Sequence, residues 1–535
     1  MYKVLISDAI DEQGIELLKE SGEIEVIYKP KSTVEDYLDV VGGIHGWIIR
    51  SGTNIGNELL IQADNLRVIG RAGVGVDNID LETATLRGVI VMNTPTGNTN
   101  AATEQTLALM LAAARKIAPA HQALKEGRWD REKYVGRELR GKTLGIIGLG
   151  RIGQGVAKRA KSFDMNVIGS DPFVSEEQFQ ALNISQATPE EIFAKADVIT
   201  AHVPINDQTR NFIDAEAIEK MKQGVILINC ARGGVFNEDA VVDGLNSGKI
   251  GAIGFDVFQH EPLNADHPFL KFDNAVLTPH LGASTREAKE NVALDICTQV
   301  RDFLIHEKVK NAVNIPFADY SKLKQLEPYL DLGERLGLLQ ITRAHGAPRE
   351  VRVRVGGDFE DIKPITLAVL KGLLGPISGD KVNLMNAALL AKQRDIKIRE
   401  SYEYNDSDYN NIIEISLTTD HGTIQASGSL FGKTHPRIVS IDDFHMDARP
   451  VGPVLMIQNK DVPGVIGNVG SFLGSRNINI AEYRLGRREE GNLALAMVNL
   501  DAPISGEDLA SLEQEQNILK VQQVNFSGET GTEAP

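Results

Sequence analysis

A chain of 535 residues with 42% hydrophobic and 24% charged side chains is too long for one core, so we expect about three or four globular domains. Its formal net charge of −17 disfavours nonspecific binding to nucleic acid or to an anionic membrane. The two cysteines exclude a disulfide scaffold and are too few for a thiol zinc cage, and no metal site is expected.

Residues 1–97 alternate strand-like runs with helix-like stretches, as in the parallel sheet of βαβ units. The first residues, MYKVLISDAI, fit a half-buried strand better than a signal peptide, and no apolar run approaches the ~18 residues of a membrane span. We therefore expect a cytoplasmic protein with no membrane partner. The alanine-rich run at 102–125 predicts one long helix that connects two lobes.

A second alternating series begins at Lys142 and predicts a doubly wound sheet, with strands in KTLGIIGL, MNVIGSD, ADVITAHVP, GVILINC, KIGAIGFDV and NAVLTPH. The amphipathic run at 284–307 can return the chain to the first lobe. The expected domains are therefore a discontinuous lobe of 1–97 and 284–316, with 98–283 inserted in it. The remainder divides into a less regular block at 317–450, a βαβ-like module at 451–527 and a polar, disordered tail at 528–535.

A glycine loop of the GxGxxG type, Gly148-Leu149-Gly150-Arg151-Ile152-Gly153, follows the first strand of the second series and precedes a helix-like run. Gly148 permits a tight turn, Gly150 lets the backbone approach a pyrophosphate, and Gly153 lets the helix pack on the strand. Asp171 ends the next strand, where a carboxylate can accept from a ribose 2′-hydroxyl and would repel a 2′-phosphate. The loop predicts NAD as cofactor, and a glycine turn in a sheet without ligand is the alternative.

Three polar side chains follow later strands of this series: Arg232 in CARGG, Glu261 in FQHEP and His280 in TPHLG. Histidine suits the removal of a hydroxyl proton near neutral pH. A carboxylate at Glu261 can orient the imidazole, and the planar fork of Arg232 can grip a substrate carboxylate. Considered alone, each residue has a simpler interpretation: His280 as an ordinary core histidine, and Arg232 and Glu261 as members of ordinary ion pairs. At sheet edges after a dinucleotide loop, they predict proton transfer beside a hydride carrier.

The motifs TLGIIGLGRIG, INCARGG, DVFQHEP and TPHLGAST resemble the D-isomer-specific 2-hydroxyacid dehydrogenases, and RAGVGVDNID resembles their substrate loop. The resemblance covers about residues 1–316. It implies an α/β fold with a Rossmann-like cofactor lobe inserted in a flavodoxin-like substrate lobe. It also implies His280 as general acid/base, Glu261 as its partner and Arg232 as the substrate-binding arginine. Further cofactor contacts implied are Val203, Cys230, Asp256 and Gly282, and the implied carboxylate-binding loop runs from Arg71 through Gly73 to Gly75.

A phosphorylated substrate would need further cations. Arg50 and Ser51, directly after the strand-like GWII, and Arg71 can converge at one edge of the first lobe, and Arg131 can reach the same place or a neighbouring subunit. Surface salt bridges explain these arginines equally well.

The whole chain resembles the long members of this family that oxidise 3-phospho-D-glycerate. An intervening domain is implied by VNLMNAALLAKQRDIKI and FGKTHPRIVSID, with Arg437 and Arg449 as anion-binding candidates. The run at 458–480 resembles an ACT domain, an α+β module in which Asn459, Asp461 and Asn479 match positions that hold L-serine. The alternative is that DVPG and RNIN are simple turns.

These features together predict NAD-dependent oxidation of 3-phospho-D-glycerate to 3-phosphooxypyruvate, the first step of L-serine biosynthesis, in a homodimer or homotetramer with L-serine as effector. Within enzymes, the alternative is a glyoxylate or hydroxypyruvate reductase. Outside enzymes, it is an NAD-sensing scaffold similar to the corepressors that share this fold.

Overall fold

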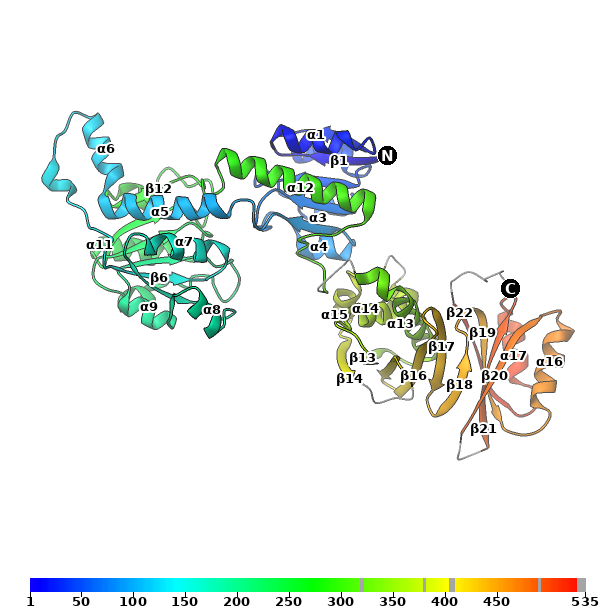
Figure 1. Ribbon diagram of the computed structural model, residues 1–535. Coiled ribbons are helices and arrows are strands. Elements are labelled where there is room, and N and C mark those ends of the chain that lie inside the picture. The colour runs from blue at the N-terminus through cyan, green and yellow to red at the C-terminus, as the bar shows by residue number, and fades with distance from the viewer. Residues whose placement is uncertain (318–321, 379–381, 404–408, 489–491, 527–535) are drawn as a thin grey trace.

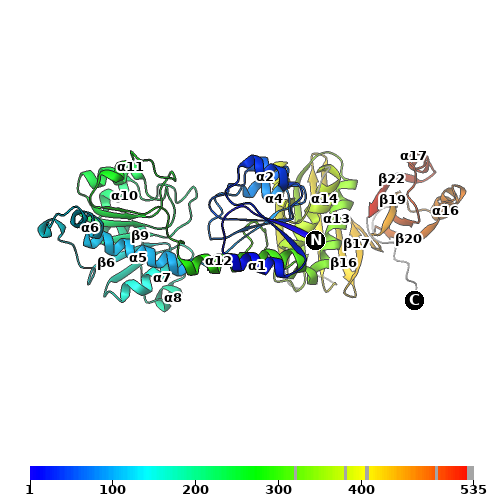
Figure 2. The same cartoon turned by 90° about the horizontal axis from the view of Figure 1, so that it is seen from above.

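The computed structural model describes residues 1–317, 322–378, 382–403, 409–488 and 492–526. The units of the chain lie in a row, with the lobe that carries the glycine loop at one end and the C-terminal module at the other (Figures 1 and 2). The tail expected to be disordered, 528–535, lies outside the described residues. Within the described part of the chain, no helix is long and apolar enough to cross a membrane.

The first lobe is a parallel sheet with the order β2 (Ile24–Tyr28), β1 (Tyr2–Ile6), β3 (Gly46–Ile49), β4 (Val68–Arg71) and β5 (Ile90–Asn93). Successive side chains of a strand point to opposite faces, so each face has its own core. The connecting helices are α1 (Glu12–Glu20), α2 (Val34–Val41), α3 (Asn57–Leu60) and α4 (Leu81–Leu86). Helix α12 (Arg286–His306) returns from the second lobe and buries Val292, Ile296 and Val300 against one face. The returning helix expected from the sequence is confirmed.

The second lobe is a parallel sheet with the order β12 (Ala275–Leu277), β11 (Ile250–Phe255), β10 (Val225–Asn229), β9 (Val198–Ala201), β6 (Thr143–Ile147), β7 (Asn166–Ser170) and β8 (Ser185–Gln186). Its helices and short 3₁₀ segments are α5 (Thr99–Arg115), α6 (Ile117–Lys125), η1 (Arg131–Tyr134), α7 (Arg151–Lys161), α8 (Glu176–Ala181), α9 (Pro189–Lys195), α10 (Ala215–Lys220), α11 (Glu238–Asn246) and η2 (Pro268–Lys271). The strand order reverses between β6 and β9. Doubly wound sheets bind ligands at such a switch point, beside the carboxyl ends of the strands.

The single helix expected over 102–125 is wrong. Lys116 has the left-handed backbone angles φ 51° and ψ 40° and ends α5, and α6 begins at Ile117. Pro119 then lies in the first turn of α6, where its missing N–H needs no partner, whereas within a continuous helix it would break a hydrogen bond. The alanine-rich composition does not register this break, although the proline is a signal for it.

The two C-terminal units share a core. The mixed sheet of the first has the order β14 (Lys397–Glu403), β13 (Pro348–Gly356), β15 (Ile412–Thr419), β16 (Gly422–Phe431), β17 (His435–Ile441) and β18 (Phe444–Ala448), with helices α13 (Leu323–Arg343), α14 (Lys363–Ser378) and α15 (Ala387–Gln393). The second has an antiparallel sheet, β20 (Ile480–Arg487), β21 (Leu493–Leu500), β19 (Gly452–Lys460) and β22 (Ile518–Phe526), with α16 (Val465–Ser475) and α17 (Gly506–Glu513) on one face. Its other face packs Val454 and Met497 into the core that contains Leu332 and Leu336 of α13. The α+β class expected for both units is confirmed.

Candidate active site

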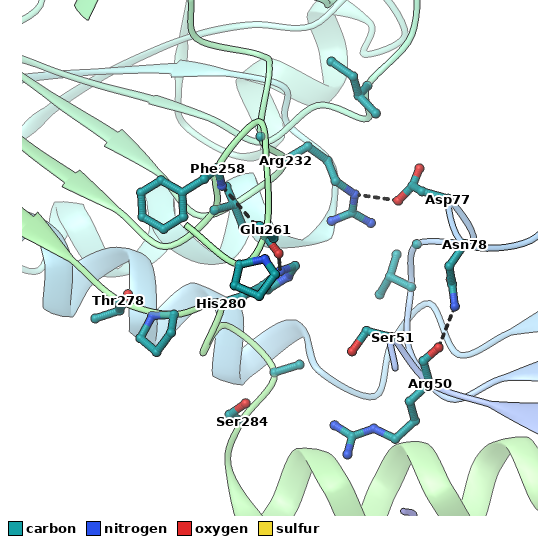
Figure 3. A pocket seen from close by; sticks show the side chains of 18 of the residues that line it. Arg50, Ser51, Asp77, Asn78, Arg232, Phe258, Glu261, Thr278, His280 and Ser284 are labelled. Atoms are coloured by element: carbon teal, nitrogen blue, oxygen red, sulfur yellow. Dashed lines mark hydrogen bonds and ion pairs between the residues drawn. The ribbon is translucent and has the colours of Figure 1, made fainter. Parts of the chain in front are cut away.

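A cleft of about 950 Å³ lies between the two lobes, and it brings together side chains that are far apart in the sequence. The first lobe contributes Arg50, Ser51 and Arg71, and the second contributes Arg232, Glu261 and His280. Figure 3 shows Arg50 and Ser51 across the cleft from Arg232, Glu261 and His280. These residues all lie at the carboxyl ends of strands or in the loops that follow. The cleft is therefore where the sequence places proton transfer.

His280 and Glu261 form a hydrogen-bonded pair in which His280 Nδ1 lies 2.7 Å from Glu261 Oε2. The other oxygen of Glu261 accepts from the backbone N–H of Phe258 at 3.0 Å, so the carboxylate is held on both sides. Burial would raise the pKa of Glu261, but the bonds from His280 and Phe258 outweigh it and lower that pKa below 4.5. A carboxylate that stays ionised can fix the imidazole and stabilise its protonated form, which leaves Nε2 for a substrate hydroxyl.

The loop that carries His280 is anchored by Asp256, which is fully buried. Its carboxylate accepts from the Thr278 hydroxyl and from the backbone N–H groups of Leu281, at 2.8 Å, and Gly282, at 2.7 Å. His280 itself has a left-handed φ of 54°, a conformation that costs energy in a residue with a β-carbon and needs such support. The structure thus gives Asp256 and Gly282 a part in holding the loop that carries His280, which their sequence positions did not indicate.

Three guanidinium groups, from Arg50, Arg71 and Arg232, face the cleft, and two carboxylates, Asp77 and Glu261, line it with them. Arg71 is partly buried, its Nε has no hydrogen-bond partner among the described residues, and its pKa is lowered to about 10, first by burial and then by the positive charges of Arg232 and Arg50. The loop after Arg71 holds Gly73 at a φ of 150°, a backbone conformation that a residue with a β-carbon rarely adopts, so this position favours glycine. Such a cluster is suited to an anion with more than one negative charge.

Arg131 does not join this cluster within the chain. It lies exposed in η1, and it is not among the residues that line the cleft.

The glycine loop has the geometry that a dinucleotide requires. Gly148 directly follows β6 with φ 91°, and a β-carbon there would lie 2.8 Å from a side-chain carbon of Val203. A β-carbon on Gly153 would lie 2.1 Å from the carbonyl oxygen of Gly148, whereas a β-carbon on Gly150 would meet nothing within 4 Å. Gly150 is also the N-cap of α7 and provides no capping side chain, so the amides of the first turn face open space. The loop fits the pyrophosphate of NAD.

Asp171 follows β7 beside this loop. Its carboxylate accepts from the backbone N–H groups of Leu149, at 2.7 Å, and Phe173, at 2.9 Å, which fixes its direction and leaves lone pairs for a ribose hydroxyl. Arg151 is exposed and Ile152 packs against the core of the lobe. Cys230 is buried, and burial raises the pKa of its thiol, so it stays an unreactive thiol behind the site.

The effector candidates of the C-terminal module already have partners inside the chain. Asp461 pairs with Arg487 at 3.2 Å, and the amide of Asn479 donates to Asp501 at 2.8 Å. Asn459 is buried, and its Oδ1 has no partner among the described residues.

The anion candidates of the intervening unit are also paired. Arg437 lies 2.9 Å from Asp447, and Arg449 lies 3.9 Å from Glu482.

Sequence reasoning missed Asp77, Asn78 and Asn98, which all line the cleft. The amide of Asn78 donates to the carbonyl groups of Arg50 and Thr53 and so links two loops of the first lobe. Asn98 precedes α5 but makes no capping bond, and its Oδ1 is buried without a partner in the described chain. An asparagine before a helix usually predicts an N-cap. Only the folded structure shows that Asn98 makes no capping bond and lines the cleft instead.

Comparison with family models matches residues 107–282 to the NAD binding domain of the D-isomer specific 2-hydroxyacid dehydrogenases. Residues 325–442 match the D-3-phosphoglycerate dehydrogenase intervening domain.

Curated relatives match over nearly the full length. The chain is 40% identical to the D-3-phosphoglycerate dehydrogenase of Archaeoglobus fulgidus over 97% of this chain and 98% of that one. It is 37% identical to that of Bacillus subtilis over 98% of this chain and 100% of that one. Among solved structures, the TT0316 protein of Thermus thermophilus covers 58% of this chain and 99% of its own, with a TM-score of 0.55 and 34% identity. A glyoxylate reductase of Paecilomyes thermophila also covers 58% of this chain, and 98% of its own, with a TM-score of 0.54 and 28% identity.

Proposed function

Because the chain belongs to the D-3-phosphoglycerate dehydrogenase family, we propose that it oxidises 3-phospho-D-glycerate to 3-phosphooxypyruvate with NAD, the first step of L-serine biosynthesis. The observation that carries the substrate assignment is the convergence of Arg50, Arg71 and Arg232 beside the His280–Glu261 pair. A substrate with a carboxylate and a phosphate satisfies this excess of positive charge, whereas glyoxylate or hydroxypyruvate has one carboxylate only.

In the proposed reaction, Arg232 and the amides of the loop at 71–75 hold the C1 carboxylate, and Arg50 and Arg71 face the phosphate. His280 Nε2 takes the proton of the C2 hydroxyl, and the nearby Glu261 carboxylate stabilises the imidazolium that forms. When bound in the loop at 148–153 and at Asp171, NAD supplies the acceptor for the C2 hydride. The products are 3-phosphooxypyruvate, NADH and the proton that His280 later releases to water.

Turnover on matched substrates tests the proposal. NADH formation is measured with 3-phospho-D-glycerate and with D-glycerate, which lacks only the phosphate. Loss of a charged hydrogen-bonding group costs roughly 1.5 to 3 kcal/mol, so kcat/KM should be at least about tenfold higher for the phosphorylated acid. Equal values, or preferred reduction of glyoxylate or hydroxypyruvate, would favour the reductase alternative, and no turnover would favour a scaffold.

We further propose that the protein is a homo-oligomer through the arm formed by α6 and η1. The arm projects from the cofactor lobe (Figure 1) and exposes Ile117, Leu124, Trp129 and Val135, which is unusual for a surface that stays in water. Arg131 lies in the same arm, so a second copy that covers the arm would contact the region around Arg131. Light scattering on the wild type and on Trp129→Ser tests this, because a monomeric wild type would contradict it.

L-serine is proposed as the effector of the C-terminal module. The support is the unpaired Oδ1 of buried Asn459 beside Asp461, whose carboxylate can exchange Arg487 for an ammonium group. Calorimetric titration of L-serine into the wild type and into Asn479→Ala tests this. The effector role fails if the wild type shows no binding.

A further inference from the structure

Asp77 makes an ion pair across the cleft with the arginine that the proposed reaction assigns to the substrate carboxylate. It follows β4 of the first lobe, and its Oδ2 lies 3.0 Å from Nε of Arg232, which follows β10 of the second lobe (Figure 3). The contact joins residues 155 positions apart in the sequence. It is therefore a link between the lobes rather than local structure.

The hydrogen-bond donors of Arg232 show which edge of the guanidinium faces the substrate loop at 71–75. NH1 donates to the carbonyl group of Ala231 at 2.7 Å, which turns that side back to the chain of the second lobe. NH2 lies against Gly75, where a β-carbon would meet it at 1.9 Å. The edge that offers two parallel donors to the substrate loop is thus Nε and NH2, and Asp77 holds the Nε of this edge.

The solvent exposure of the two side chains determines how firmly Asp77 holds the Arg232 guanidinium. The Asp77 side chain is 61% exposed and that of Arg232 is 29% exposed, so water screens the pair. The backbone next to Asp77 is fixed, because the amide of Asn78 donates to Arg50 and Thr53 at 2.7 and 2.6 Å. The carboxylate of Asp77 can therefore rotate away from Arg232 without moving the loop.

The charges around the cleft explain why a carboxylate is useful at the position of Asp77. The positive charges of Arg232 and Arg50 lower the pKa of Arg71, after the larger effect of its burial, and the charge of Asp77 acts in the opposite direction. Asp77 thus offsets part of the repulsion among the three guanidinium groups. A substrate that brings its own negative charges makes this compensation unnecessary.

We propose that Asp77 is an internal stand-in for the substrate carboxylate: it holds Arg232 in the empty enzyme and gives it up when substrate binds. Asp77 is then a positioning residue that acts through Arg232, and it competes with the substrate. This inference rests on the proposed function, since it takes Arg232 as the carboxylate-binding residue.

Asp77→Asn tests the inference, because the amide keeps the size of the side chain and removes its charge. Competition predicts that KM for 3-phospho-D-glycerate, and its dissociation constant from the enzyme–NADH complex measured by NADH fluorescence, fall by about twofold to fivefold, the range for an exposed ion pair. The KM for NAD should stay unchanged, and Asp77→Glu should return the substrate KM toward the wild-type value.

Asp64→Asn is the matched control. It removes another exposed aspartate of the same lobe, paired with Arg87 at 2.8 Å and outside the cleft lining, and substrate binding should stay at the wild-type value. If Asp77→Asn binds phosphoglycerate equally well or more weakly while the wild type turns it over, the inference is wrong and the proposed function stands. Absence of wild-type turnover removes the proposed function, and the inference with it.

Discussion

Replacing Glu261 with glutamine tests the proposed proton transfer most directly. Glutamine keeps the size of the side chain but has no charge, and it can offer an N–H to His280 in place of a lone pair. His280 becomes positively charged when it takes the hydroxyl proton. Loss of the Glu261 charge therefore destabilises mainly the transition state and lowers kcat.

The magnitude follows from the geometry of the pair. A 2.7 Å contact places the two charge centres about 4 Å apart, where their attraction is about 1 kcal/mol in water and about 4 kcal/mol at an effective dielectric constant of about 20. The His280 and Glu261 side chains are 47% and 35% exposed, but substrate and cofactor exclude water from the cleft during turnover. At about 1.4 kcal/mol per tenfold change, we expect kcat to fall by about 10²- to 10³-fold.

Initial rates of NADH formation, with circular dichroism to check folding, measure this effect. Glu191→Gln, which breaks an exposed pair with Lys195 in the same lobe, is the control and should keep wild-type activity. A Glu261→Gln variant with more than half of the wild-type kcat would refute the assigned role of the pair.

Stability gives a second measurement on the same variant. Because the pKa of Glu261 is lowered in the folded protein, its carboxylate stabilises the fold above the unfolded-state value. This contribution is lost as the pH falls through the lowered pKa. The wild type should therefore be more stable than Glu261→Gln at neutral pH, and the difference should shrink in acid.

Four further substitutions test the other parts of the site. Asp171→Asn should raise KM for NAD by about tenfold and reduce the preference for NAD over NADP, because the charge that repels a 2′-phosphate is gone; an unchanged ratio of the two kcat/KM values would contradict the assignment. Gly153→Ala places a β-carbon 2.1 Å from the Gly148 carbonyl oxygen, so thermal unfolding should occur at a lower temperature, whereas Gly150→Ala should keep wild-type stability and only weaken NAD binding in a titration. Arg71→Gln should lower kcat/KM for 3-phospho-D-glycerate by about 10- to 100-fold with little change in KM for NAD, and equal loss with D-glycerate would place Arg71 away from the phosphate.

The strand patterns and the glycine loop were readable from the sequence because they depend on neighbouring residues. Short apolar runs that alternate with helix-like stretches indicated the strands of both lobes, and the spacing of Gly148, Gly150 and Gly153 indicated the cofactor loop. Arg232, Glu261 and His280 stood out because each follows a strand, and parallel strands bring their carboxyl ends to one edge. The broken helix at Lys116 was missed because composition outweighed the one proline that signals it.

Contacts across the cleft depended on tertiary structure. Whether Arg50 and Arg71 face a ligand or an ordinary surface partner depends on how one lobe is set against the other, and no local periodicity encodes that placement. The pair between Asp77 and Arg232 joins two loops that are each unremarkable in sequence, and Asp256 holds the His280 loop through backbone amides that any residue would supply. The sequence thus determined the chemistry available to this protein, and the packing of the two lobes decided which charges meet.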